Sequence, residues 1–278
     1  MPGKKVLLVE GSDDEHVLKH ICGERGVGQL DEVKPQGDVL RLLENLPVRL
    51  KESDVEALGV VVDADTDLAA RWQSLHDRLT KAGYQNVPAH PAPTGTILAP
   101  PSDSLLPRVG VWIMPDNQTR GILEDFLRFL VPPGSGLFTH VQSSVAGIPP
   151  AEKRFTQLAE PKAIIHTWLA WQEVPGRPLG TAITAKFLDA NVAQVDVLVA
   201  WLKRLFFPWL TGCPQAEATP NHPTSPPSQP SSIWTPPATR IPSTNATARS
   251  SASSTSCASP PDEPNRNKHP SAQTAPAP

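Results

Sequence analysis

Cysteines and long apolar runs are scarce in this sequence. Its 278 residues include only three cysteines, at widely separated positions: Cys22, Cys213 and Cys257. An odd number at such spacing excludes a disulfide framework and the paired cysteines of a structural zinc site. No apolar run reaches the roughly 18 residues that a membrane-spanning helix needs, and Glu10 interrupts the first apolar run too early for a signal peptide. We therefore expect a cytoplasmic protein without a membrane partner.

Aromatic residues are also few, whereas prolines are abundant and unevenly placed. Aromatic residues make up 5% of the chain, and 15 of the 33 prolines fall between Pro214 and Pro278. The sequence around them is rich in serine, threonine and alanine, which bury too little apolar surface to offset the entropy of an ordered chain. We expect residues 213–278 to form a disordered tail.

An excess of positive charge is absent as well. The formal net charge is -3 at pH 7, and the four basic and three acidic residues of 213–278 leave -4 for the rest of the chain. A protein that binds nucleic acid tightly usually has a basic surface instead. The charge balance argues against such a surface, but it leaves open a local basic groove or a site that meets phosphate through a metal ion.

The apolar residues alternate between two spacings along the first 130 residues. Short continuous apolar runs, typical of strands buried on both faces, are separated by segments with apolar residues at helical spacing. This alternation predicts an α/β fold with a mainly parallel central sheet flanked by helices. We expect this α/β domain to comprise residues 1–131 and a helical extension packed on it to comprise 132–212. The expected strands lie at 6–9, near Val33, and at 57–62, 94–98 and 109–114.

The first helix is expected to begin at Ser12. Ser12 and Glu15 have the spacing of a capping box, in which each side chain binds the backbone N–H of the other residue. Asp13, Asp14 and Glu15 then lie in the first helical turn, where the helix dipole favours acidic side chains. On this interpretation these acids stabilise the helix and belong to no functional site.

Other acidic residues follow the predicted strands. Glu10 follows the first strand, while Asp63 and Asp65 follow the second long strand, with both carboxylates on one side. Asp116 follows the next strand, and Glu124 lies in the helix after it. The carboxyl ends of parallel strands meet at one edge of a sheet, where active sites lie. Carboxylates crowded there raise one another's pKa unless a cation neutralises them, and Mg²⁺ or Mn²⁺ prefers such oxygen ligands.

Two stretches resemble a Toprim domain, the magnesium-binding module of type IA and type II topoisomerases, bacterial primases and overcoming-lysogenization-defect nucleases. They are VLLVEGSDD at 6–14 and GVVVDAD at 59–65. Further stretches are similar to a bacterial Toprim-like family of unknown function: VGVWIMPDN at 109–117 with GILEDF at 121–126, and HTWLAWQE at 166–173. The resemblance covers most of residues 4–207 and none of the tail.

The resemblance implies a role for each matching residue. Glu10 would be the general acid or base of phosphodiester chemistry and also a metal ligand, while Asp63 and Asp65 would hold Mg²⁺ or Mn²⁺. Glu124, with Asp116 as the second choice, would complete the set of carboxylates as in the nuclease branch.

Two further assignments depend on residues near this set. Asp67 occupies the place of a third acid in topoisomerase-type domains, but it also suits the N-cap of the following helix, and we favour the cap. A basic group is expected to face the charge that develops on the phosphate. Lys186 and Lys162, both from the predicted helical segment, are the candidates, and Lys186 is placed first.

Three functions fit these observations. The residues favour an Mg²⁺-dependent, nuclease-like phosphodiesterase that acts on nucleic acid. The acidic balance favours instead a non-catalytic Toprim-like module that binds a nucleotide, a nucleic acid or a protein. The third is a phosphoacceptor receiver domain with Asp63 phosphorylated, although Asp13 and Asp14 come three residues late for that family and no lysine–proline follows the last strand. The sequence leaves the oligomeric state open.

Overall fold

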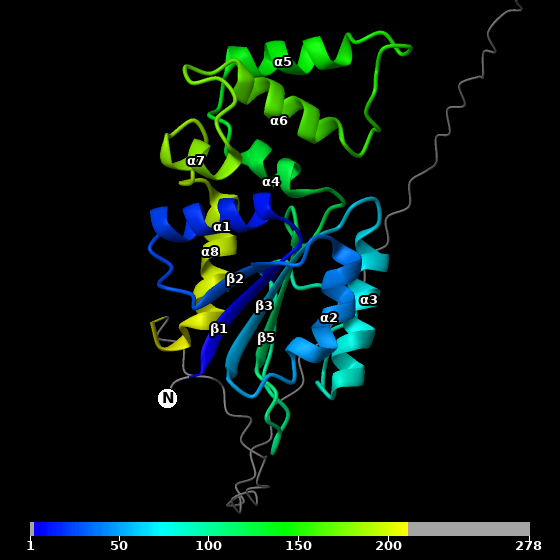
Figure 1. Cartoon of the computed structure of the whole chain (residues 1–278), viewed down its shortest axis with the longest axis vertical. Helices are drawn as coiled ribbons and strands as arrows, with labels where there is room; N and C mark the ends of the chain where they lie inside the picture. The colour runs from blue at the N-terminus through cyan, green and yellow to red at the C-terminus, as the bar shows by residue number, and fades with distance from the viewer. Residues whose placement is uncertain (1–2, 211–278) are drawn as a thin grey trace, which may run out of the picture. The chain divides into compact units, whose positions relative to one another are not determined.

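A five-stranded sheet lies at the centre of residues 3–210, the part of the chain that the computed structural model describes (Figure 1). The strand order is β2-β1-β3-β5-β4, and every neighbouring pair is parallel except β4 with β5. The mainly parallel sheet is thus confirmed, while the tail expected at 213–278 lies outside the described residues. The strands are β1 (Lys4–Val9), β2 (Glu32–Pro35), β3 (Val55–Asp63), β4 (Thr96–Leu98) and β5 (Arg108–Met114).

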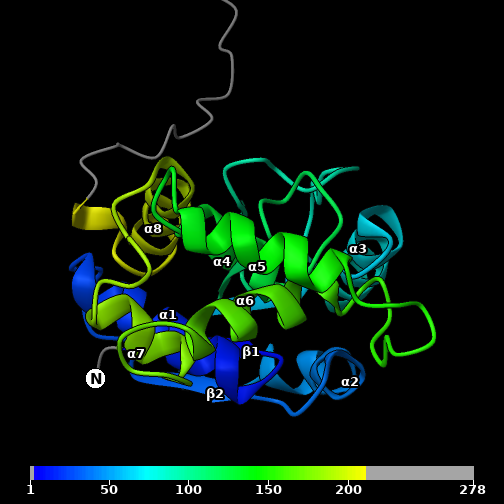
Figure 2. The same cartoon turned by 90° about the horizontal axis from the view of Figure 1, so that it is seen from above.

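Eight α-helices of the described residues surround this sheet. Helices α2 and α3 cover one face, α1 and α8 pack on the other, and α4 to α7 gather beyond the carboxyl ends of the strands (Figures 1 and 2). None of these helices is long and apolar enough to cross a membrane. They are α1 (Ser12–Glu24), α2 (Val39–Arg49), α3 (Leu68–Ala82), α4 (Leu123–Phe129), α5 (Gly136–Ala146), α6 (Glu160–Ala170), α7 (Leu179–Thr184) and α8 (Ala193–Phe206), with a 3-10 turn, η1, at Pro208–Leu210.

The continuous apolar runs form strands because both faces of the sheet are buried. Along β1, Leu7 and Val9 belong to the core beneath α1 and α8, whereas Val6 and Leu8 belong to the core beneath α2 and α3. Successive side chains of a strand point to opposite faces, so a run without polar residues supplies both cores at once. The edge strand β4 is short and antiparallel.

Helix α8 approaches the sheet closely at two glycines that pair with each other, Gly59 on β3 and Gly110 on β5. A Cβ at Gly59 would lie 2.6 Å from Leu7 and 2.9 Å from Phe206, and a Cβ at Gly110 would lie 2.5 Å from Leu205. The missing side chains therefore make room for the apolar face of α8. The C-terminal part of the described chain thus completes one face of the sheet.

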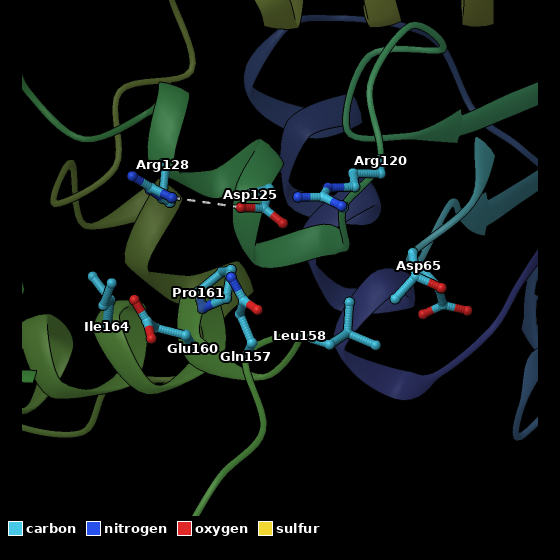
Figure 3. A pocket seen from close by; sticks show the side chains of 11 residues that line it. Asp65, Arg120, Asp125, Arg128, Gln157, Leu158, Glu160, Pro161 and Ile164 are labelled. Atoms are coloured by element: carbon cyan, nitrogen blue, oxygen red, sulfur yellow. Dashed lines mark ion pairs between the residues drawn. The ribbon is translucent and has the colours of Figure 1, made fainter. Parts of the chain in front are cut away.

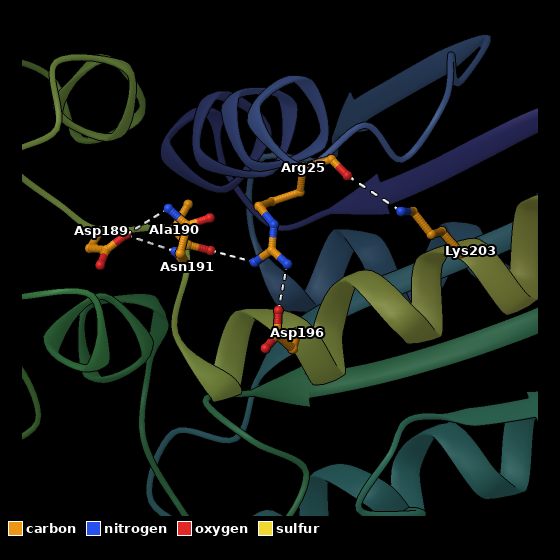
Figure 4. Close-up of polar contacts among 6 residues, drawn as sticks. All are labelled: Arg25, Asp189, Ala190, Asn191, Asp196 and Lys203. Carbon is orange, nitrogen blue, oxygen red and sulfur yellow. Dashed lines mark hydrogen bonds and ion pairs between the residues drawn. The ribbon is translucent and has the colours of Figure 1, made fainter.

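A polar cluster fixes the same helix to the end of α1 (Figure 4). Arg25 donates to the carbonyl oxygen of Ala190 at 2.5 Å and pairs with Asp196 at 2.5 Å. Lys203 donates to the carbonyl oxygen of Arg25 at 3.4 Å. These contacts join residues more than 160 positions apart, and they bring the start of α8 against the first βα unit.

The start of α1 differs from the sequence-based expectation. The N-cap is Gly11 rather than Ser12, and Asp14 Oδ2 accepts a hydrogen bond from the Gly11 N–H at 3.1 Å. The predicted capping box between Ser12 and Glu15 was therefore wrong by one residue. Because the cap lies one residue earlier, Asp14 turns inward, whereas Glu15 pairs with Lys19 on the surface.

Replacing Gly110 with alanine tests the close packing of α8. The added methyl group would overlap Leu205, so we expect the free energy of unfolding to fall by about 1–3 kcal/mol, as for other overpacked cores. Urea denaturation of Gly110→Ala measures the loss. Gly136→Ala is the matched control, because nothing lies within 4 Å of a Cβ at that position in α5. Equal stability of the two variants would contradict the packing described above.

Candidate functional site

Two of the predicted site residues meet at the carboxyl ends of neighbouring strands. Glu10 follows β1 directly, and Asp63 is the last residue of β3. Because β1 and β3 pair in parallel, both residues lie at the same edge of the sheet. The backbone N–H of Asp63 donates to Glu10 Oε1 at 2.7 Å. This hydrogen bond holds the Glu10 carboxylate against the end of β3.

Asp14 adds a third carboxylate from the first turn of α1. Its residue surface is only 7% exposed, and its Oδ1 atom is buried without a hydrogen-bond partner. Burial raises the pKa of both Glu10 and Asp63, and the negative charge of Asp14 raises each pKa further. Asp14 therefore lies within electrostatic reach of both strand-end acids.

Glu124 reaches the same place from α4, beyond the edge of the sheet. It is 3% exposed, and after burial its charge is a further cause of the raised pKa of Asp14 and of Asp63. Its Oε1 lies 3.4 Å from Lys162 Nζ and 3.9 Å from His166 Nε2, both on α6. We call Glu10, Asp14, Asp63 and Glu124 the carboxylate cluster.

Burial is the main cause of the unusual proton affinity of this cluster. It raises the pKa of Glu10 to about 7 and the pKa of Asp14 to about 6. Burial followed by the charges of Asp14 and Glu10 raises the pKa of Asp63 well above its usual range, and Asp63 Oδ1 has no hydrogen-bond partner. Near neutral pH the cluster must therefore bind protons or a cation to relieve the repulsion between its members.

Asp65 lies at the rim of the cluster and already has a cationic partner. Arg71, on α3, pairs with the Asp65 carboxylate and donates from Nε to the carbonyl oxygen of Asp63 at 2.8 Å. Asp65 and Gly121 also exchange two backbone hydrogen bonds of 2.9 Å each. The loop after β3 is thus joined to the segment that leads into α4.

Two other acids near the strand ends have local structural partners. Asp67 caps α3, because its Oδ1 accepts a hydrogen bond from the Ala70 N–H at 3.0 Å. Asp116 Oδ1 accepts hydrogen bonds from the N–H groups of Gln118 and Thr119, at 2.9 and 2.8 Å. The structure therefore gives Asp116 a role in its own turn and does not bring it into the carboxylate cluster.

The two candidate lysines lie at opposite ends of α1. Lys162 is 4.0 Å from Asp13, at the beginning of α1, and 3.4 Å from Glu124 on α4. Lys186 instead pairs with Glu24, the last residue of α1. Glu24 is ten residues beyond Asp14, which corresponds to roughly 15 Å along a helix. Lys162 is accordingly the lysine that the structure brings to the cluster.

Sequence reasoning misses Asp14, Arg71 and His166. Asp14 lies three residues after Gly11, which is the spacing of an N-cap residue and its N3 acid. This spacing does not reveal that the Asp14 side chain is buried. Arg71 and His166 meet their partners only through the packing of α3 and α6, for which the spacing in the sequence carries no signal.

Comparison with known proteins assigns the chain to a family. The model of a family described as "Protein of unknown function (DUF3226)" matches residues 4–207. The chain belongs to the DUF3226 family. No curated protein and no solved structure matches it. The expected membership of a family of unknown function is thus confirmed, and the family description assigns no activity to the carboxylate cluster.

The chemistry of this DUF3226 site fits a hard cation, although the ligands are not fully assembled. Among residues 3–210, no three histidine, cysteine, aspartate or glutamate side chains are grouped so as to hold a metal ion. The buried Oδ1 atoms of Asp14 and Asp63 nevertheless have no hydrogen-bond partner. Carboxylate oxygens of this kind are ligands that Mg²⁺ and Mn²⁺ prefer.

Stability without metal should depend on pH through Glu10. Its pKa rises from an ordinary 4.5 to about 7 on folding, so the folded chain loses stability as pH rises through this interval. As pH rises from 4.5 to 8, the unfolding free energy of Glu10→Gln should therefore increase relative to that of the wild type, by up to roughly 3 kcal/mol. Each tenfold change in proton affinity is worth about 1.4 kcal/mol. Urea denaturation of both proteins in EDTA, at a series of pH values, measures this difference in stability.

Glu44→Gln is the control for this measurement, because Glu44 is exposed on α2 and lies outside the carboxylate cluster. The stability difference from the wild type should vary with pH more for Glu10→Gln than for Glu44→Gln. If the Glu10→Gln difference varied no more than the Glu44→Gln difference, Glu10 would not have the raised pKa that its burial implies.

Proposed function

We propose that this DUF3226 protein is a Toprim-like, Mg²⁺-dependent phosphodiesterase that acts on nucleic acid. The resemblance of residues 6–14 and 59–65 to Toprim domains supports this function. So does the position of Glu10 and Asp63 at the carboxyl ends of adjacent parallel strands. Mn²⁺ has the same preference for oxygen ligands and is expected to replace Mg²⁺.

One observation carries the proposal: two buried carboxylate oxygens without hydrogen-bond partners lie among mutually repelling acids. These atoms are Asp14 Oδ1 and Asp63 Oδ1. A buried polar atom without a partner costs free energy, and a buried charge costs more. A purely structural cluster would be expected to supply donors to these atoms, whereas a cation site leaves them free for a ligand.

The residues of the cluster have separable roles under this proposal. Asp63, Glu10 and Glu124 would hold the metal ion, with Asp14 beside them and Asp65 at the rim beside Arg71. A bound Mg²⁺ would neutralise these acids and polarise a phosphoryl oxygen. Glu10, held by the Asp63 N–H, would transfer a proton during cleavage. Lys162 would stabilise negative charge that develops on the phosphate.

A second candidate function is a Toprim-like module that binds a nucleotide or nucleic acid without cleaving it. The observation that favours it is the incomplete assembly of the ligands, since no metal-holding group of three side chains occurs within 3–210. A site that only senses or binds a ligand requires no fixed metal geometry. Catalysis in the presence of metal separates the two functions.

Cleavage of labelled DNA and RNA by the full chain tests the first function. The wild type should cleave in Mg²⁺ or Mn²⁺ and not in EDTA, while Glu10→Gln and Asp63→Asn should lose activity by at least about a hundredfold, the lower range for general acid–base catalysis. Metal should also raise the unfolding free energy of the wild type, by about 2.7 kcal/mol at one hundred times Kd. It should stabilise Asp63→Asn less.

The two lysines provide a matched pair within the same assay. Lys162→Met should lower kcat by about a hundredfold, as removal of a charge-stabilising donor does in other enzymes. Lys186→Met should retain wild-type activity, because Lys186 pairs with Glu24 at the other end of α1. Stabilisation by metal without cleavage by any sample would favour the binding module, and equal activity of the wild type and Asp63→Asn would refute the proposed site.

A further inference from the structure

A cavity of about 370 Å³ opens beside the rim of the carboxylate cluster (Figure 3). It lies between Asp65 after β3, the segment from Arg120 into α4, and the beginning of α6. A second hollow of about 410 Å³ shares Arg120, Asp125 and Arg128 with it, and it is also lined by Phe129 and Phe138. The two hollows, which we call the groove, therefore lie next to each other along these shared residues, and the first of them reaches Asp65 at the rim of the candidate metal site.

The acids that line the cavity are already neutralised by other groups. Asp65 pairs with Arg71, and Glu160 pairs with Lys153 at 2.6 Å. Asp125 lies 3.6 Å from Arg128 and accepts a hydrogen bond from a backbone N–H at 3.1 Å. In Figure 3, Asp125 lies between Arg128 and Arg120, and only Arg128 is joined to it by an ion pair.

Arg120 is the positive charge of the cavity that has no partner. Its side chain is exposed and makes no hydrogen bond or ion pair with any residue of the described chain. Because the lining acids have cationic partners and Arg120 has no anionic one, the groove has an excess of positive charge at this point. A planar guanidinium binds phosphate through two parallel hydrogen bonds, which makes arginine well suited to this anion.

The backbone fixes Arg120 relative to the candidate metal site. The next residue, Gly121, exchanges two hydrogen bonds of 2.9 Å with Asp65. Gly121 has a φ of +148°, and a Cβ there would lie 2.7 Å from Asp125 Oδ2. A side chain at this position would be strained and would overlap Asp125, so glycine suits the segment that joins Arg120 to the loop carrying Asp65.

We propose that the cavity binds a backbone phosphate of the nucleic-acid strand, next to the phosphate at the carboxylate cluster, with Arg120 as its charged ligand. This inference rests on the proposed function, because it takes the reacting phosphate to lie at the cluster. The cavity volume falls in the range of small-ligand sites, and it accommodates a phosphate with part of its sugar. Arg120 thus serves binding and positioning rather than the chemical step.

The proposal is tested by the affinity of the full chain for a fluorescein-labelled 10-mer of single-stranded nucleic acid. Fluorescence anisotropy measures this affinity in the presence of Ca²⁺. Arg120→Ala should raise Kd about tenfold, equivalent to about 1.4 kcal/mol. The slope of log K against log salt should become less steep by about 0.7, because one phosphate contact is lost. The matched control is Arg154→Ala, since Arg154 is also exposed, has no side-chain partner within 3–210 and does not line the groove.

Cleavage kinetics and binding together separate this proposal from the proposed function. If the wild type cleaves, Arg120→Ala should raise KM and leave kcat nearly unchanged. Suppose that the wild type cleaves, but Arg120→Ala and Arg154→Ala have the same Kd, salt slope and KM. This result would overturn the phosphate site and leave the catalytic proposal standing. Binding that depends on Arg120 without cleavage by any sample would support the phosphate site and overturn catalysis. A wild type that does not bind the 10-mer would overturn the phosphate site.

Discussion

Burial of several carboxylates at one edge of the sheet is the constraint on which the site depends. Glu10 and Asp63 are brought there by parallel pairing of β1 and β3, while Asp14 and Glu124 arrive from α1 and α4. Apolar packing on both faces holds these elements in place regardless of the repulsion at their ends. The free energy of the fold thus maintains a cluster that is unfavourable by itself at neutral pH, and binding of a cation would release that cost.

The helices beyond the sheet are part of the same arrangement. Glu124 on α4 closes one side of the cluster, and α6 contributes Lys162 and His166 to that same carboxylate. Helix α8 then returns to the sheet and packs over Gly59 and Gly110. The residues after β5 therefore complete both the candidate site and the core. A chain lacking them would expose the part of the sheet that α8 covers and lose the positive charge of Lys162 next to the cluster.

The sequence predicts the sheet well because the relevant signal is local. Continuous apolar runs such as 6–9 identify strands buried on both faces, and acids placed after those strands identify Glu10 and Asp63 as neighbours in space. Tertiary partners carry no comparable signal. Spacing alone does not reveal that Asp14 turns inward beneath a Gly11 cap. Nor does it reveal that Lys162 rather than Lys186 approaches the cluster, because this depends on where α6 and the segment after α7 lie relative to α1. Asp116 illustrates another limit, since the sequence does not tell whether a carboxylate after a strand serves its own turn or a metal ion.

The most direct test of a cation-dependent cluster is the number of protons released when Mg²⁺ binds. Calorimetric titration of the full chain at pH 6.5, in two buffers with different ionisation enthalpies, measures that number. The raised pKa values of Glu10 and Asp14, caused mainly by burial, imply protons that the metal must displace. We predict the release of about one proton per Mg²⁺ bound by the wild type. Binding without proton release, or no binding at all, would contradict the account.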